Sequence, residues 1–198
     1  MKTAINRIPL VLTLIVAMIV AGCVPSLHPL YTDKDVVFEP ALVGVWAEKE
    51  DSEETWAFEK AGDKAYKLVY TEKGKKGEFK VHLVKLGNTL FLDLYPDDTA
   101  LKEIDRNDFY KSHLLLAHTF AKVTQIEPRL QMAFFNPDWL KKLLEKDPKA
   151  IGHEKIDEDR IVLTASTKEL QGFVLAHANT KDAFGDEPMN LKRIKSKP

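Results

Sequence analysis

Hydrophobic and polar residues alternate with a period of two along the segment from Leu42 to Tyr95. Such alternation is typical of antiparallel strands that bury one face. Turn residues interrupt the pattern, and Gly87-Asn88 is a two-residue hairpin signal. The strands predicted in this way cover residues 42–47, 55–59, 65–70, 78–84 and 89–95. We therefore predict a β-meander over this part of the chain.

The alternation also predicts which side chains are buried. The apolar face carries large residues, among them Trp46, Trp56, Phe58, Tyr66 and Tyr70. The opposite face is expected to meet solvent, and it carries Thr55, Glu59, Lys67, Lys80, His82 and Asp93.

The stretch from His113 to Val123 is apolar on both faces, so a strand there must be covered on both sides, and a helix is the natural cover. Residues 129–135 continue the sheet. Asn136-Pro137-Asp138 combines an N-cap residue with proline at the first helical position, which predicts a helix over 137–146. Ser166 and Glu169 have capping-box spacing, which predicts a second helix over 167–178.

Two shorter patterns complete the fold. Residues 153–156 and 160–165 read as a hairpin between the helices, and residues 191–194 read as a last strand that closes the sheet. The predicted fold class is mainly β (α+β), with an antiparallel meander that forms a barrel or a strongly curved sheet and carries two α-helices.

The chain begins with a segment of different character. Lys2 and Arg7 precede an uncharged apolar run over residues 8–21. That run is shorter than the ~20 residues that cross a bilayer as a helix, and it fits the core of a secretory signal. We expect residues 1–22 to be a signal peptide, residues 23–41 to be a tether that lies partly on the body, and residues 42–198 to be one β-rich domain.

The end of this segment, Val20-Ala21-Gly22-Cys23, resembles the lipobox of bacterial lipoproteins. The resemblance implies cleavage before Cys23, transfer of a diacylglyceryl group to its thiol, acylation of the new amine and a membrane as partner. Val24, rather than Asp, follows the cysteine, which resembles the outer-membrane pattern if the host is Gram-negative. The alternatives are a plain secretory signal beside a chance cysteine and a single N-terminal membrane anchor.

Composition and charge exclude several function classes. About 44% of the residues are apolar, which is enough for a core. Removal of residues 1–22 leaves 27 of the 29 basic residues against 30 acidic ones, so the domain is mildly acidic and unsuited to nucleic acid. Cys23 is the one cysteine of the sequence, which excludes disulfides, thiolate catalysis and cysteine-based metal sites in the domain.

Gly44-Val45-Trp46, at the start of the meander, resembles the G-x-W signature of lipocalins and related calycin barrels. The resemblance implies a closed barrel with a tryptophan at one end and an internal cavity for an apolar ligand. Two predicted helices before the last strand depart from the usual lipocalin pattern. The stretch from Cys23 to Trp46 also resembles exported lipoproteins that are known only as uncharacterised sequences, and this second resemblance implies no activity.

The candidate ligand-binding residues are Trp46, Trp56, Tyr70, His118 and Phe120. His118 reads either as a core histidine with a hydrogen-bond partner or as a polar group that orients a ligand in an apolar pocket. His113 lies on the other face of the same predicted strand, so the two histidines cannot chelate one metal there. We expect no catalytic set, no metal site and no cofactor, because neither the common catalytic motifs nor paired metal-ligand spacings occur.

These patterns favour a non-enzymatic lipoprotein of the bacterial cell envelope, anchored through acylated Cys23. We expect it to be a binding or accessory module whose partner is a small apolar ligand or another envelope protein. Two alternatives stay open, namely a hydrolase-type enzyme that uses His118 in a cleft and a structural or inhibitory protein that acts through its loops.

Overall fold

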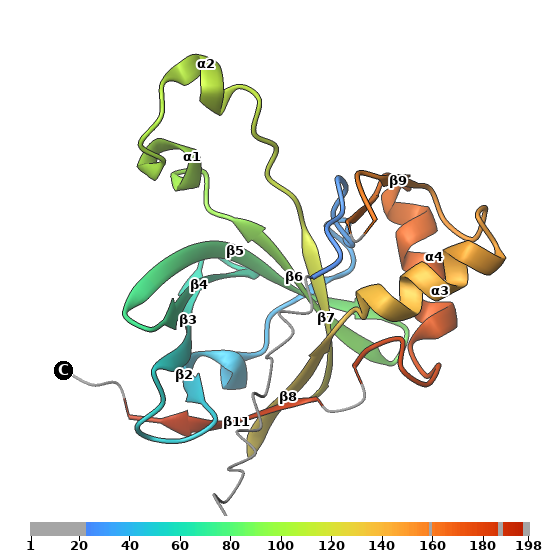
Figure 1. Ribbon diagram of the computed structural model, residues 1–198. Helices are drawn as coiled ribbons and strands as arrows, with labels where there is room; N and C mark the ends of the chain where they lie inside the picture. Colours follow the sequence, from blue (N-terminus) through green and yellow to red (C-terminus); the bar gives the residue numbers. More distant parts are fainter. Residues whose placement is uncertain (1–22, 159, 186–187, 196–198) are drawn as a thin grey trace, which may run out of the picture.

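The computed structural model describes residues 23–158, 160–185 and 188–195, and the predicted signal peptide over residues 1–22 lies outside them. Within the described residues, eight antiparallel strands close into an up-and-down barrel (Figure 1). The structure thus confirms the predicted mainly β fold, in the form of a closed barrel rather than an open curved sheet.

The barrel strands follow one another around the wall in chain order, and the last pairs with the first. They are β2 (Gly44–Ala47), β3 (Glu54–Ala61), β4 (Ala65–Glu72), β5 (Lys75–Leu86), β6 (Thr89–Pro96), β7 (Thr119–Gln125), β8 (Arg129–Phe134) and β11 (Met189–Ile194). A short strand, β1 (Val36–Val37), lies beside the far end of β5.

Large side chains fill the inside of the barrel, as the alternation predicts. Trp46, Tyr66 and Met132 are fully buried there, and Phe58 is almost so. An eight-stranded barrel is just wide enough inside for side chains to fill it. The interior therefore forms one of two hydrophobic cores.

A short 3-10 helix, η1 (Pro40–Leu42), precedes β2, and its Leu42 is buried in the interior core. The indole N–H of Trp46 donates to the carbonyl of Leu42 at 2.9 Å, and the Arg193 guanidinium lies over the Trp46 ring at 4.3 Å. Arg193 also donates to the carbonyls of Ala41 and Val43. Gly44 has φ 140°, and a Cβ at this position would collide with the Arg193 guanidinium, so the G-x-W glycine has a steric reason.

A second core lies outside the barrel, between its wall and the helices (Figure 1). Helix α3 (Pro137–Lys146) begins at the Asn136 cap, and helix α4 (Thr167–His177) begins at the Ser166–Glu169 capping box, so both predicted helices are confirmed. The predicted hairpin is also present, as β9 (His153–Lys155) and β10 (Ile161–Leu163). Phe120 of β7 and Phe173 of α4 are buried in this core.

The connection between β6 and β7, residues 97–118, stands away from the barrel, and we call it the arm (Figure 1). It carries two single-turn helices, α1 (Ala100–Glu103) and α2 (Asp108–Lys111). The prediction of a strand from His113 is wrong, because β7 begins only at Thr119 and Leu115 is 81% exposed. The expected helical cover exists, but it covers the outer face of β7 at Phe120 and not the preceding leucines.

Candidate functional site

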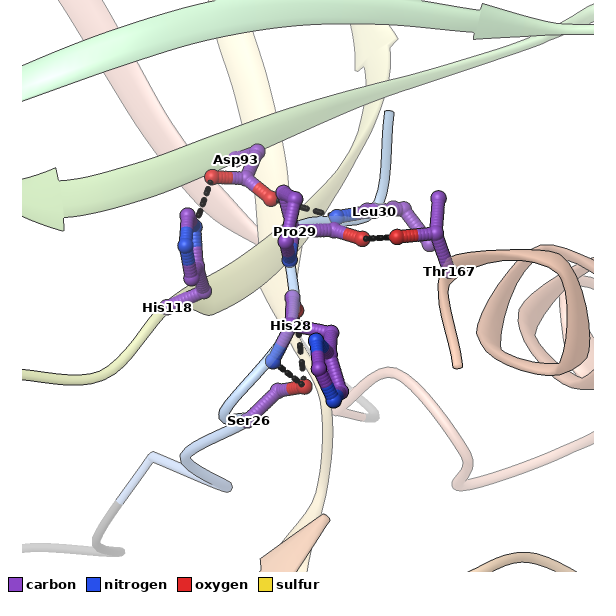
Figure 2. A network of polar contacts seen from close by, with 7 residues as sticks. All are labelled: Ser26, His28, Pro29, Leu30, Asp93, His118 and Thr167. Atoms are coloured by element: carbon purple, nitrogen blue, oxygen red, sulfur yellow. Dashed lines mark hydrogen bonds and ion pairs between the residues drawn. The ribbon is translucent and has the colours of Figure 1, made fainter. Parts of the chain in front are cut away.

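Residues 24–31 lie between the barrel wall and the helical layer, and we call this segment the strap (Figure 2). The strap is the first part of the predicted tether, yet Val24, Ser26 and Leu30 are buried. Among the described residues, which start at Cys23, burial begins at Val24, and Cys23 itself is exposed.

Backbone hydrogen bonds hold the strap on two sides. Ser26 and His118 exchange N–H to carbonyl bonds of 2.9 Å in both directions. On the other side, Leu27 donates to the carbonyl of Leu163, and Leu163 donates to the carbonyl of Pro25, each at 2.9 Å. The strap is thus bonded like a short strand between the base of the arm and β10.

Side chains of α4 complete this attachment. The Thr167 hydroxyl donates to the carbonyl of Pro29 at 2.8 Å, and the Gln171 amide donates to the carbonyl of Leu30 at 2.9 Å. The buried hydroxyl of Ser26 donates to the carbonyl of His28 within the strap, also at 2.9 Å. The carbonyls of His28, Pro29 and Leu30 therefore have hydrogen-bond partners within the protein.

Asp93 is the polar centre of this region, because its side chain is fully buried on the outer face of β6. One carboxylate oxygen accepts the Leu30 N–H at 2.7 Å, and the other lies 2.7 Å from Nδ1 of His118 (Figure 2). The prediction that Asp93 lies on a solvated face is wrong, because the strap covers this part of the wall. A buried carboxylate is tolerated only when hydrogen bonds compensate its lost hydration.

His118 joins the strap, the arm and the barrel wall. Its side chain is 12% exposed, and its ring lies 4.5 Å from that of Tyr95. An ionised carboxylate can only accept, so with Asp93 in that form the bond is donated by Nδ1 of His118. No hydrogen bond joins Nε2 to another described residue. The bond to Asp93 therefore orients the His118 ring.

Burial in this region also shifts the pKa values of two neighbouring groups, His82 and Tyr31. The pKa of His82, which is opposite Asp93 in the sheet register, is lowered mainly by burial, while the Asp93 charge acts against this shift. The pKa of Tyr31 is raised, first by burial and then by the charges of Asp93 and Asp33. The two rings lie 4.2 Å apart. The site thus favours neutral forms of both rings beside one buried carboxylate.

The predicted ligand-binding residues do not form one site. Trp46, Trp56 and Tyr70 belong to the barrel interior, whereas His118 and Phe120 lie outside the wall, next to the strap. The pattern of alternation cannot separate them, because it does not say which face of β7 is the inner one.

Inside the barrel, Trp56 and Tyr70 come together near the end from which the arm projects. Their ring centroids lie 4.7 Å apart, and the Phe134 ring lies 6.1 Å from that of Trp56. The pKa of Tyr70 is raised to about 12, mainly by burial and then by the charges of Glu54 and Glu72. These rings occupy the interior themselves.

An open hollow of about 350 Å³ lies near the same end, between the β2–β3 loop and β11. It is lined by Glu48, Ser52, Glu54, Pro188, Met189, Asn190 and Leu191. Among the described residues, no three His, Cys, Asp or Glu side chains are placed to hold a metal ion. The residues that line this hollow do not include the polar groups that surround Asp93.

Sequence reasoning missed Asp93, Ser26 and Leu30 as parts of a site. One signal was present, since Phe91 and Val84, which are apolar, share the outer face of the wall with Asp93 and His82. Apolar residues on a supposedly solvated face indicate a cover, but the sequence does not say what provides it.

Comparison with known proteins adds no relative, because no family model, no curated protein and no solved structure matches the chain. Among the described residues, no helix is long and apolar enough to cross a membrane.

Proposed function

We propose that the chain is a bacterial envelope lipoprotein, anchored through acylated Cys23, and that it serves as a non-catalytic binding or accessory module. The observation that carries the proposal is the position of Cys23, which is exposed directly before a buried residue, Val24. An acyl group on the exposed Cys23 would extend away from the folded domain and would not disturb either hydrophobic core. The lipobox resemblance supplies the chemistry.

The strap gives this anchor a mechanical role. Acyl chains are held in a bilayer at ~0.8 kcal/mol per buried CH₂, so two or three chains make a lasting anchor. The bonds from Ser26, Leu27 and Leu30 to the domain transmit that attachment to the barrel within a few residues. We propose that the barrel is therefore held close to the membrane with a restricted orientation.

The anchor is tested by growing cells with labelled palmitate. We expect the wild-type protein to be labelled and the Cys23→Ser variant to be unlabelled, with both proteins present in equal amounts. A Ser26→Ala variant is the matched control, because it changes a neighbouring buried residue and keeps the thiol. Equal labelling of wild type and Cys23→Ser would refute the anchor.

The packed interior favours binding at the outer surface over storage of a ligand inside the barrel. Large rings already occupy the space between the walls, while Phe109 and Leu115 of the arm are exposed. Native mass spectrometry of protein purified from the envelope tests this choice. A co-purified lipid of fixed mass would favour a ligand site, and a ligand-free protein supports action through loops.

A second candidate function has one specific observation in its favour. The buried carboxylate of Asp93 holds Nδ1 of His118 and leaves Nε2 free, which is how a general base is oriented in hydrolases. No hydroxyl of the described residues is hydrogen-bonded to Nε2, so such an enzyme would activate water. Ester hydrolysis that is lost in His118→Gln and kept in His113→Gln would establish it.

A further inference from the structure

Large apolar side chains are exposed on the arm. Phe109 is 78% exposed and Tyr110 is 51% exposed on α2, and Leu115 follows on the way back to the barrel. The turn that presents them is ordered by local bonds. The Asn107 side chain accepts the Tyr110 N–H at 2.9 Å, and the His113 ring packs on Phe109 with centroids 4.7 Å apart.

The arm and Cys23 are joined at one point of the fold. Ser26 of the strap pairs with His118 at the base of the arm. Cys23 lies three residues before Ser26, and Leu115 lies three residues before His118. The pairing is antiparallel, so the two segments leave it in opposite directions, and over three residues each reaches at most ~11 Å from it.

Other exposed apolar residues lie around the strap. Leu27, in the strap itself, and Ile156, at the tip of the β9–β10 hairpin, are both exposed. In Figure 1 the arm with α2, the blue strap and the β9 hairpin all lie along the upper side of the molecule. Exposed apolar residues thus occur in three segments whose backbones lie in the upper half of this view.

We propose that the arm, led by Phe109 and Tyr110, inserts into the headgroup region of the bilayer that holds acylated Cys23. This inference rests on the proposed lipid anchor. The anchor keeps the base of the arm near the lipid, and aromatic side chains favour the membrane–water interface. The arm and the acyl group then form two attachments, and two attachments fix an orientation that one cannot.

The charge of the arm decides what kind of contact this is. Residues 97–118 carry five acidic and three basic side chains, so an anionic surface does not attract them. Apolar insertion therefore drives the contact. It should occur on zwitterionic lipid and persist at high salt, because salt screens charges and leaves apolar burial in place.

Quenching by brominated lipid tests the proposal on the full acylated protein in phosphatidylcholine vesicles. Phe109→Trp places an indole on the arm, and Lys64→Trp places one in the β3–β4 turn at the opposite end of the barrel. The parent protein supplies the background emission of its three tryptophans, of which Trp46 and Trp56 are buried and Trp139 is partly buried. The measured quantity is the additional emission of each variant with and without bromine in the acyl chains.

We expect the Phe109→Trp emission to shift to the blue and to fall by at least about half, because an interfacial side chain lies ~5–10 Å into the headgroup boundary. The Lys64→Trp emission should not change. Equal and unquenched emission from both variants, with Cys23 acylated by mass, would overturn the inference and would leave another protein as the partner of the arm. Absence of the acyl mass itself would instead refute the anchor.

Discussion

Replacement of Asp93 tests whether the strap is held as we describe. Asp93→Ala removes the acceptor of the Leu30 N–H and of the His118 Nδ1–H. Hydrogen bonds to charged groups contribute about 1.5–3 kcal/mol each, which gives about 3–6 kcal/mol for the two. Without the carboxylate, the folded state no longer carries the cost of desolvating it, which offsets part of this loss. We therefore expect the free energy of unfolding to fall by about 2–4 kcal/mol.

The assay is urea unfolding of the mature chain with Cys23→Ser in the background of every variant. With a slope of about 2 kcal/mol per molar urea, the expected loss lowers the midpoint by about 1–2 M. Asp93→Asn should lower the free energy of unfolding by about half as much or less. Its amide can accept from the Leu30 N–H and donate to Nδ1 of the other His118 tautomer. Asp98→Ala is the control, and this exposed partner of Lys80 should change stability by less than about 1 kcal/mol.

Amide hydrogen exchange would show which part of the protein is destabilised in Asp93→Ala. The Leu30 amide should exchange faster in Asp93→Ala, because its acceptor is gone while the barrel strands keep theirs. An Asp93→Ala protein as stable as the Asp98→Ala control, with an unchanged Leu30 amide, would refute the view that Asp93 holds the strap.

Three further outcomes check other parts of the structure. Arg193→Lys should lower the free energy of unfolding by about 1–2 kcal/mol, since lysine cannot bond both carbonyls and cover Trp46 at once; a urea curve equal to wild type would contradict this. Ser166→Ala should cost about 1 kcal/mol by the same assay, through loss of the α4 cap. The raised pKa of Tyr70 means that the unfolded chain releases its proton first, so stability should fall as pH rises from 10 towards 12. Tyr70→Phe should reduce that fall and Tyr110→Phe should not, as followed by urea midpoints across this pH range.

Local patterns predicted most of the barrel and both helices for clear reasons. A hairpin depends on alternation and a turn within about twenty residues, and each helix depends on a cap beside its own first turn. The Ser166–Glu169 box and the Asn136 cap are therefore visible in the sequence and confirmed in the structure. Pairing of β11 with β2 joins residues about 150 apart, and the sequence only indicated that a last strand was available.

The site could not be predicted in the same way. Asp93 has the alternation of an exposed residue, and it is buried because a segment more than sixty residues earlier covers it. The arm leucines have the alternation of a buried strand, and Leu115 is exposed because the helices reach only as far as Phe120. In both cases the local pattern is unchanged, and a distant segment decides the burial.

The sequence alone determined what depends on neighbours along the chain: the strands, the turns, the helix caps and the lipobox resemblance at Cys23. The tertiary structure alone decided which strands close the barrel, which face of β7 is inside and what lies over Asp93. Closure and burial are properties of segments that meet in space, and a one-dimensional pattern records the preference of each segment but not its partner. For this protein, the strap that connects the proposed anchor to the barrel is the part that only the fold reveals.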